Sequence, residues 1–307
     1  MDRIDRIKST CPSLILRERV PLSAYTTLRV GGEAAVFAEP KTEEEIAALL
    51  CAAKEADVPV LVLGNGSNTL VRDGGFPGIV LHLGREYGEV ACAGNTLTAQ
   101  AGALLSTLAK TACENGLTGL EFASGIPGSV GGGVHMNAGA YGGELSQAVQ
   151  RIRVWDGERI RDVSREEMDF SYRHTAAMEH GWLILSAVFT LSPGNKVEIE
   201  SVMRDLNARR REKQPLEYPS AGSFFKRPAG HYAGQLIERS GLKGVTVGGA
   251  QVSEKHAGFL INRGGATAGD FLSLMERVRQ TVKKDSGVLL ENEVRIVGQE
   301  RKEADGA

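Results

Sequence analysis

The first part of the chain alternates between segments with helical and with strand-like spacing of apolar residues. In residues 42–56, TEEEIAALLCAAKEA, the apolar positions follow a helical period behind Thr42 and Glu45, a pair typical of a capping box. The next run, PVLVLG at residues 59–64, is apolar throughout and predicts a buried strand. A helix, a strand and then the glycine loop GNGSN, residues 64–68, are therefore expected in this order.

Later segments continue to mix the two spacings. Helical spacing predicts helices over residues 96–116, 197–215, 231–244 and 268–287. Strand-like runs cover residues 182–194 and 288–298. Between them, Asp156 and Gly157 indicate a hairpin turn, and Ser164 with Glu167 would cap a short helix over residues 164–170. This mixture predicts an α+β fold.

The pattern changes near residue 195, where a charged helix replaces the preceding strands. We therefore expect a domain boundary there. Residues 1–194 would form one domain of two subdomains that meet near residue 85, and residues 195–307 a smaller α+β domain. The three consecutive arginines Arg209–Arg211 in the charged helix favour a solvated face, with phosphate binding as the alternative.

Composition and charge exclude several kinds of partner. The 36 Lys and Arg nearly balance the 38 Asp and Glu, so neither nucleic acid binding nor membrane insertion is expected. The four cysteines form no CxxC pair and the six histidines never take the spacing of a helical metal site, so we expect reduced thiols and no metal. No apolar run has the length of a signal peptide or a membrane span. A cytoplasmic location is the default expectation.

The loop GNGSN does not fit a Rossmann nucleotide site. That site needs a third glycine and a helix that begins directly after the loop. Here residues 69–82, TLVRDGGFPGIVLH, predict two extended runs around a glycine turn, so the loop joins strand to strand. Two interpretations stay open: a tight turn of small residues, or a nest of backbone N–H groups that holds phosphate, with Ser67 and Asn68 as added donors.

A second glycine cluster, GLEFASGIPGSVGGGVHMNAGAYGGE at residues 119–144, breaks this tie. Flexible linkers lack apolar residues that must pack, whereas this segment interleaves its glycines with side chains such as Ile126 and Val130. We interpret it as ordered backbone around a large planar or phosphorylated ligand, with Asn137 and Tyr141 as polar contacts. Two such segments predict a cofactor of dinucleotide size.

Eight stretches in the same order resemble the UDP-N-acetylenolpyruvoylglucosamine reductase family, the flavoenzymes of peptidoglycan precursor synthesis. They are YTTLRVGG, LGNGSNTLVRDGGFPG, the second glycine cluster, FSYRHT, PSAGSFFKRP, AGQLIERSGLKG, GGAQVSEKHAGFLIN and LLENEVRIVG, and they span residues 25–298. The first half is also similar to FAD domains of the vanillyl-alcohol-oxidase type. The chain length resembles the compact form of the family, which lacks an extra loop over the substrate.

This resemblance implies a reaction in two stages. NADPH would reduce noncovalently bound FAD, and the reduced flavin would pass hydride to the enolpyruvyl group of UDP-N-acetylglucosamine enolpyruvate, which gives UDP-N-acetylmuramate. By the same resemblance Ser223 donates the proton, Arg173 grips the substrate carboxylate and Glu293 is the catalytic glutamate. From the residues alone, a surface ion pair is the favoured interpretation of both Arg173 and Glu293, and only the match to EVR selects Glu293 over Glu291.

The resemblance also places binding residues. Predicted cofactor contacts are Gly64, Asn65, Gly66, Ser67, Asn68, Gly125, Gly131, Ala138 and Gly139. Predicted substrate contacts are Tyr172, Lys226, Gln251 and Asn262, although each of these can equally be a structural residue. Phe224 and Phe225 are expected to anchor the Ser223 loop in the core. No obligate protein partner is expected.

Two other functions remain open at this stage. The first is an FAD-dependent oxidase of the same fold, which would leave the motifs SAGSFFK and NEVR unexplained. The second is a nucleotide-binding module without chemistry, in which Ser223 and Glu293 could be replaced without loss of function.

Overall fold

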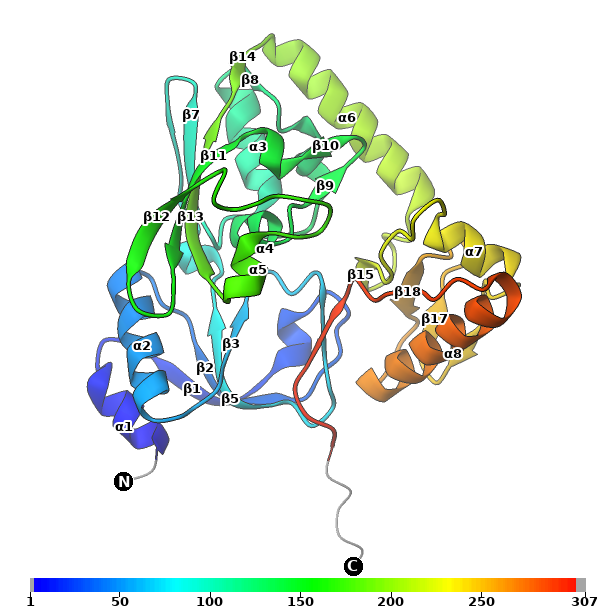
Figure 1. The fold of residues 1–307 in the computed structure, drawn as a ribbon, viewed down its shortest axis with the longest axis horizontal. Coiled ribbons are helices and arrows are strands. Elements are labelled where there is room, and N and C mark those ends of the chain that lie inside the picture. The colour runs from blue at the N-terminus through cyan, green and yellow to red at the C-terminus, as the bar shows by residue number, and fades with distance from the viewer. Residues whose placement is uncertain (1–2, 302–307) are drawn as a thin grey trace, which may run out of the picture. The chain divides into compact units, whose positions relative to one another are not determined.

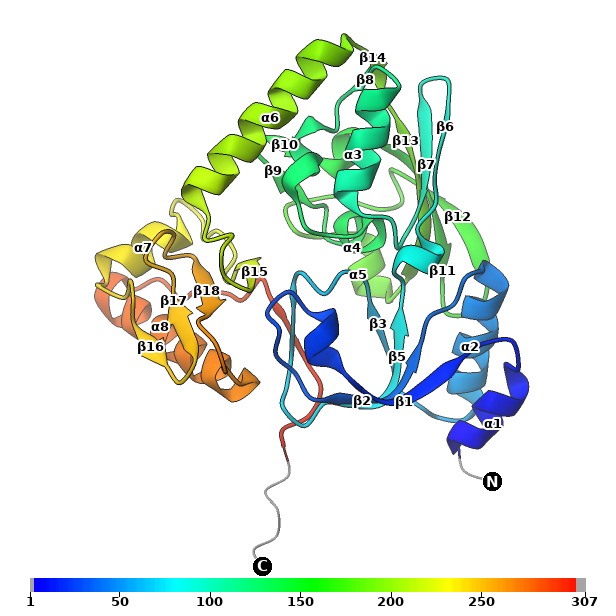
Figure 2. The same ribbon diagram turned by 180° about the vertical axis from the view of Figure 1, so that it is seen from behind.

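The computed structural model describes residues 3–301, which form two compact units, each assembled from separate stretches of the chain. Unit 1 contains residues up to Arg17, Phe37–Asn65 and Ile79–Arg210, and unit 2 contains Glu18–Val36, Gly66–Gly78 and the residues from Arg211 on. Figure 1 and Figure 2 show the elements of both units from opposite sides. Four elements run through a unit boundary: β1 (Leu16–Pro21), β2 (Glu33–Ala38), β5 (Phe76–His82) and α6 (Lys196–Lys213).

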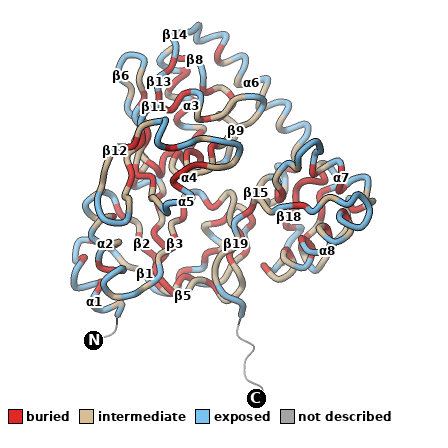
Figure 3. The backbone as a smooth tube through the Cα atoms, viewed as in Figure 1, coloured by how far each residue is buried: buried red, intermediate tan, exposed pale blue. Residues whose placement is uncertain are grey.

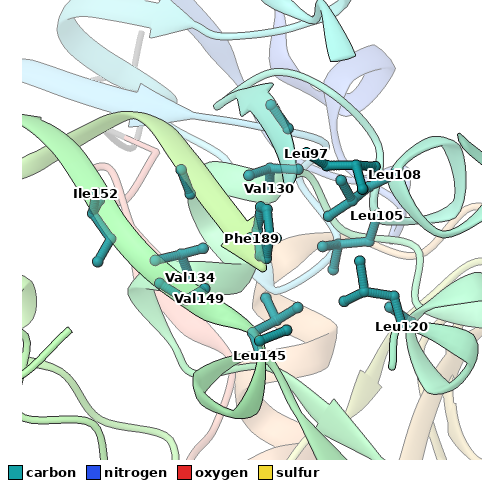
Figure 4. Packing of buried hydrophobic residues seen from close by; sticks show 14 of the residues in the cluster. Leu97, Leu105, Leu108, Leu120, Val130, Val134, Leu145, Val149, Ile152 and Phe189 are labelled. Atoms are coloured by element: carbon teal, nitrogen blue, oxygen red, sulfur yellow. The ribbon is translucent and has the colours of Figure 1, made fainter. Parts of the chain in front are cut away.

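Unit 1 is built on a five-stranded antiparallel sheet with the strand order β12-β11-β13-β7-β6. The strands of this sheet are β6 (Val90–Ala93), β7 (Thr96–Gln100), β11 (Val149–Trp155), β12 (Ile160–Ser164) and β13 (Leu183–Thr190). Two helices, α3 (Leu105–Glu114) and α4 (Val130–His135), pack with it. In Figure 4 Phe189 of β13 lies among Leu105, Val130 and Leu145, which come from three other segments. This shared core fixes the second glycine cluster, which contains α4, against the sheet.

The remaining elements of unit 1 are shorter or lie apart from that sheet. They are α1 (Arg3–Thr10), α2 (Glu43–Glu55), β3 (Val60–Leu63), η2 (Arg85–Tyr87), β8 (Leu117–Thr118), η3 (Glu121–Gly125), β9 (Gly139–Ala140), β10 (Gly143–Glu144), η4 (Leu145–Gln147), α5 (Ala176–His180) and β14 (Ser192–Pro193). Helix α2 begins as predicted, because the Thr42 side chain accepts a hydrogen bond from the Glu45 backbone N–H. Strand β3 follows it and pairs in parallel with β5.

Unit 2 combines a four-stranded sheet of order β15-β18-β17-β16 with two helices. Its elements are η1 (Leu22–Tyr25), β4 (Thr69–Val71), β15 (Ser220–Ser223), α7 (Ala233–Arg239), β16 (Thr246–Val247), β17 (Ala250–Val252), β18 (Phe259–Asn262), α8 (Ala268–Ser286) and β19 (Arg295–Val297). Buried and exposed positions alternate along α8 in Figure 3, as expected of an amphipathic helix. Strand β19 pairs in parallel with β4, which joins the end of the chain to the segment after the first glycine loop.

Three predicted elements differ from the observed ones. Residues 96–116 are not one helix, because TLTAQ has the alternating burial of a strand and pairs with β13 and β6 before α3 begins. In place of the helix over residues 164–170, β12 ends at Ser164 and residues 165–169 form a turn: Ser164 and Glu167 do exchange hydrogen bonds, but Asp169 has φ +42°, which stops a helix. Of the strand predicted over 288–298, only β19 forms a ladder, and Asn292 contributes a single bridge to Phe225.

The two observed units also do not correspond to two domains divided at residue 195. The first fifteen residues of α6 belong to unit 1, whereas residues 18–36 and 66–78 belong to unit 2. The reason is that YTTLRVGG and β4 form hydrogen bonds and strand pairs with the C-terminal segments, which a division by sequence order cannot anticipate. Among residues 3–301 no helix is long and apolar enough to cross a bilayer, and no cluster of three His, Cys, Asp or Glu side chains could hold a metal ion.

Candidate active site

The first glycine loop, residues 64–68, joins β3 to β4 as predicted. Gly66 has φ +59°, and a Cβ atom at this position would collide with the carbonyl oxygen of Tyr25, so only glycine fits. In the described part of the chain the backbone N–H groups of Asn65, Gly66 and Ser67 have no hydrogen-bond acceptor. Three successive N–H groups without a protein partner are what an anion-binding nest requires.

Within unit 1 the start of this loop lies against the second glycine cluster. The Asn65 side-chain amide donates to the Pro127 carbonyl oxygen (Nδ2···O 2.6 Å). A Cβ atom on Gly64 would collide with the Ser129 hydroxyl oxygen. The structure therefore brings together two of the segments that the sequence assigned to one cofactor.

In the second glycine cluster, backbone groups around α4 are hydrogen-bonded within the protein. The N–H groups of Val130 and Gly131, at the start of α4, donate to the carbonyl oxygens of Ala103 (2.7 Å) and Ala101 (2.9 Å). A Cβ atom on Gly131 would lie 2.7 Å from the Cβ of Ala101. The Ala138 N–H donates to the carbonyl of Gly133 (2.8 Å), and the Ala138 methyl group packs on the core of unit 1. Glycine at position 131 therefore allows α4 to pack closely on the backbone near Ala101.

Gly125 makes room for the end of α6. A Cβ atom on Gly125 would lie 2.5 Å from the side-chain oxygen of Asn207 and 3.2 Å from Cδ of Arg210. The Arg210 guanidinium has no hydrogen bond or ion pair among residues 3–301, and its burial lowers its pKa, which nearby Tyr141 partly offsets. By contrast, neighbouring Arg209 is exposed and forms an ion pair with Asp205 (2.8 Å). The two arginines are indistinguishable in the sequence, and of the two only Arg210 joins the candidate anion-binding residues.

Arg173 occupies a strained turn of unit 1. Ser171 and His174 pair through two backbone hydrogen bonds, so Tyr172 and Arg173 form the tip, and Arg173 has φ +56°. A side chain in this left-handed region costs free energy, and such strain is concentrated at functional sites. The guanidinium donates to the carbonyl oxygens of Asn137 (3.3 Å) and Gly139 (3.2 Å) and lies over the Tyr172 ring. Arg173 and Tyr172 are thus held at the predicted cofactor segment.

Asn137 was expected to contact a ligand, but the protein uses its side chain. Its amide is buried, donates to Glu144 (3.0 Å) and to the carbonyl of Ser171 (3.1 Å), and accepts from the Ser146 N–H (3.1 Å). Asn137 therefore joins the β9–β10 hairpin to the turn that carries Arg173. Tyr141 of the same segment remains exposed.

In unit 2, Ser223 lies at the end of edge strand β15 with its side chain exposed. The ladder between β15 and β18 contains an irregularity between Ser220 and Ser223, and Gly222 within it has φ +75°. A bulge of this kind re-aims the side chain that follows it. Directly after Ser223, Phe224 and Phe225 are buried, which confirms their role as core anchors.

Glu293 lies on the segment that runs antiparallel to residues 224–226. The Glu293 N–H donates to the carbonyl of Phe224 (3.0 Å), and the Lys226 N–H donates to the carbonyl of Glu291 (2.9 Å). The Lys226 ammonium forms an exposed ion pair with Glu291 (3.5 Å). The chain is therefore folded so that the backbone of Glu293 is fixed one residue away from Ser223.

Asn68 connects the first glycine loop to this segment. Its side-chain amide donates to the carbonyl of Glu293 (3.0 Å), and its own carbonyl accepts from the Arg295 N–H (3.0 Å). A residue predicted to hold the cofactor thus also positions a predicted catalytic residue. No local pattern predicts this contact, because the two residues are 225 positions apart along the chain.

Gln251 and Asn262 form hydrogen bonds inside unit 2. The Gln251 amide donates to the carbonyl of Gly244 (3.2 Å). Asn262 is buried: its amide donates to the carbonyl of Leu28 (3.1 Å), and its oxygen accepts from the Gly264 N–H (2.9 Å). These contacts support the structural alternative for both residues, and their contact with a substrate remains a prediction.

Comparison with known proteins places this site in a family. A model of the UDP-N-acetylenolpyruvoylglucosamine reductase C-terminal domain matches residues 214–297, and a model of an FAD binding domain matches residues 34–159. The UDP-N-acetylenolpyruvoylglucosamine reductase of Lactobacillus acidophilus is 50% identical over 93% of this chain and 96% of its own length. The chain belongs to the UDP-N-acetylenolpyruvoylglucosamine reductase family. It is an FAD-dependent oxidoreductase of peptidoglycan precursor synthesis.

Solved structures agree with this assignment. The crystal structure of the Thermus caldophilus reductase of this family is 37% identical, has a TM-score of 0.80, and covers 92% of this chain and 99% of its own. A variant of Phl p 4, a glucose oxidase, has a TM-score of 0.50 at 15% identity and shares the fold alone. The predicted α+β fold, with an FAD-binding domain of the vanillyl-alcohol-oxidase type and a smaller C-terminal domain, is confirmed.

Proposed function

We propose that the protein uses NADPH and bound FAD to reduce UDP-N-acetylglucosamine enolpyruvate to UDP-N-acetylmuramate. The observation that carries this proposal is the exposed Ser223 at the end of the irregular strand β15, whose neighbour Phe224 forms backbone hydrogen bonds with Gly258 and Glu293. An oxidase that uses oxygen has no need for a proton donor held in this way.

Ser223 would protonate the carbon next to the substrate carboxylate. When hydride adds to the terminal vinyl carbon, negative charge develops on this neighbouring carbon and is delocalised into the carboxylate. A serine hydroxyl is a weak acid, so a donated proton must be replaced quickly. A general acid in this position contributes a factor of about 10² to 10⁴ to the rate.

Arg173 would bind the substrate carboxylate. A planar guanidinium can donate two parallel hydrogen bonds to two oxygens and oppose the growing charge. The backbone carbonyls of Asn137 and Gly139 hold it from one side, so its orientation is set before the substrate arrives. Electrostatic help of this kind is worth about 10²- to 10³-fold for one group.

Glu293 would act as a protonated or donor-positioning group. An ionised carboxylate next to a developing dianion would be unfavourable, because like charges repel. Asn68 and Phe224 hold the backbone on both sides of the residue, which limits where its carboxyl group can lie. Tyr172, Lys226, Gln251 and Asn262 remain proposed substrate contacts.

The residues fit noncovalent FAD. The N–H groups of Asn65, Gly66 and Ser67 would donate to its diphosphate, and Asn68, the last residue of the loop, would contact it as well. Arg210 of unit 1 would supply a positive charge. Gly64 would lie at the same diphosphate, and Gly125, Gly131, Ala138 and Gly139 would border the flavin and ribityl chain. When bound, FAD accepts hydride from NADPH and delivers it to the substrate. We also propose a cytoplasmic location and a division of roles along the sequence, distinct from the two compact units, in which residues 1–194 supply most cofactor contacts and residues 195–307 most substrate contacts.

An anaerobic absorbance titration tests this function. NADPH is added to the purified holoprotein and then UDP-N-acetylglucosamine enolpyruvate, while the flavin band is followed. We expect the band to bleach with NADPH and to return with the enolpyruvyl nucleotide. Recovery only on admission of oxygen would instead indicate an oxidase, and a band that never bleaches would indicate a binding module.

A further inference from the structure

The motif YTTLRVGG, residues 25–32, has no role in the reaction described above, yet Thr27 within it connects two functional segments of unit 2. Its backbone N–H donates to the carbonyl of Gly66 in the first glycine loop (3.2 Å). Its hydroxyl donates to the carbonyl of Ser220 in β15 (2.6 Å), a residue 193 positions later in the chain. The same hydroxyl is 3.5 Å from the Gly66 carbonyl, so its single proton is directed to Ser220.

The middle of strand β15 is not paired in register with β18, although Ala221 within it is buried in the core of unit 2. Ser220 pairs with Ile261 at one end and Ser223 with Phe259 at the other, and the register shifts between them. A Cβ atom on Gly222 would meet no atom within 4 Å, so no neighbour packs on this point of the bulge. The position of the Ser223 hydroxyl therefore depends on how firmly both ends of the strand are held.

Both ends of β15 are held from within its own sheet, since the Asn262 N–H donates to the carbonyl of Pro219 (2.9 Å), directly before Ser220. The Phe224 N–H donates to the carbonyl of Gly258 (2.9 Å), directly after Ser223. At the first of these ends, the hydroxyl of Thr27 also reaches Ser220 from outside the sheet. Because the backbone of Thr27 is itself bonded to Gly66, this support comes from the loop that would bind phosphate.

We infer that Thr27 is a positioning residue that sets the Ser223 hydroxyl in register with the first glycine loop. Asn68 makes the equivalent connection from the same loop to Glu293. The loop at residues 66–68 would thus align both predicted catalytic residues of unit 2 with the cofactor. This inference rests on the proposed function of Ser223, but the contact itself can be tested separately.

The decisive variant is Thr27→Val, which keeps the branched shape of the side chain and removes only the hydroxyl. We expect flavin reduction by NADPH to stay within about twofold of the wild-type rate. Reoxidation by the enolpyruvyl nucleotide should slow by about 10- to 100-fold, since small misplacements of a reacting group cost this much. The solvent deuterium isotope effect on reoxidation should rise, because proton transfer becomes more rate-limiting.

Three further variants make this result specific. Thr27→Ser restores a hydroxyl and should recover most of the reoxidation rate. Thr26→Val is the matched control: Thr26 is a buried neighbour whose hydroxyl bonds to Val30 inside the motif (3.0 Å), so its loss should leave the ratio of the two half-reactions unchanged. Ser223→Ala, measured alongside, should slow reoxidation selectively.

The outcomes separate the two claims. If Ser223→Ala slows reoxidation selectively while Thr27→Val behaves like wild type, or slows both half-reactions equally, the inference on Thr27 is wrong. If Ser223→Ala has no selective effect, the proton-donor role fails instead. The contact is then judged by hydrogen exchange: amides of β15 and residues 66–68 should exchange faster in Thr27→Val than in Thr26→Val, and unchanged exchange overturns the inference.

Discussion

The two glycine-rich segments use glycine for different physical reasons. In the second cluster, residues 119–144, glycines such as Gly125 and Gly131 give space to neighbouring protein atoms, and the N–H groups at the start of α4 have backbone acceptors. In the first loop, Gly66 also packs tightly, but three successive N–H groups at residues 65–67 have no acceptor in the described chain. The first loop therefore presents three consecutive donors to a ligand.

This difference shows that glycine content alone does not locate a phosphate site. Three successive N–H groups without a protein acceptor, on the exposed Asn65, the buried Gly66 and the partly exposed Ser67, are available to water or to an anion. The first loop fits phosphate through its backbone. Next to the second cluster, the group that could bind a phosphate is the half-buried guanidinium of Arg210, for which Gly125 leaves space. The following variants separate packing from ligand binding in the two segments.

The largest effect is expected from packing in the second cluster. Gly131→Ala places a methyl group 2.7 Å from the Cβ of Ala101, and we expect the free energy of unfolding in urea to fall by about 1–3 kcal/mol. Gly132→Ala is the control in the same helix, because its nearest neighbour, the Ser129 hydroxyl, is at 3.6 Å. It should be neutral or more stable by up to about 1 kcal/mol. Equal losses for both variants would contradict this account of the cluster.

Next in size is the effect of the half-buried arginine on cofactor affinity. Arg210→Ala should raise the dissociation constant of FAD about 10- to 100-fold, because a hydrogen bond to a charged group contributes about 1.5–3 kcal/mol. The exposed, ion-paired Arg209 is its neighbour in α6, and Arg209→Ala should change the constant by less than about twofold. FAD fluorescence titration of the apoprotein measures the dissociation constant of both variants. If both lost affinity to a similar extent, the effect would come from the positive charge of the helix as a whole and not from Arg210.

A smaller effect is expected from a serine in each segment. Ser67→Ala should raise the FAD dissociation constant by about 2- to 10-fold through loss of one hydrogen bond. The Ser124 hydroxyl instead bonds to Glu121 and Asn207 within unit 1. Ser124→Ala should lower the thermal midpoint without changing FAD affinity. If Ser124→Ala weakened FAD binding and Ser67→Ala only lowered the thermal midpoint, the proposed difference between the two segments would be wrong.

The smallest effect concerns pH. Burial lowers the pKa of His256 below its ordinary value of 6.5, and its Nδ1 accepts from the Gly258 N–H (3.1 Å), with Lys243 and Glu238 as the charged neighbours. The unfolded chain then binds the proton more readily, so the free energy of unfolding should fall as pH drops through about 6.5. His256→Gln should remove this slope and the exposed His231→Gln should retain it, as measured by urea unfolding at several pH values.

The sequence predicted those parts of the molecule that local patterns determine. The cap at Thr42, the strand-to-strand course of GNGSN and the hairpin at Asp156 all follow from neighbouring residues. It failed for residues 96–100, because their strand exists through pairing with β13 and β6, which no local pattern contains.

The candidate site shows the same limit. The family motifs identified Ser223, Arg173 and Glu293, but the contacts that position them are long-range. Thr27 reaches Ser220, and Asn68 reaches Glu293, across about two hundred residues of chain. The three arginines 209–211 were indistinguishable in sequence, and only folding makes Arg210 a half-buried charge.

The central claim, that Ser223 donates the proton in a two-stage reduction, is tested most directly by anaerobic stopped-flow measurement of both half-reactions in Ser223→Ala. We predict flavin reduction by NADPH within about twofold of wild type, and reoxidation by UDP-N-acetylglucosamine enolpyruvate slower by about 10² to 10⁴. Equal slowing of both half-reactions, or wild-type reoxidation, would contradict the account.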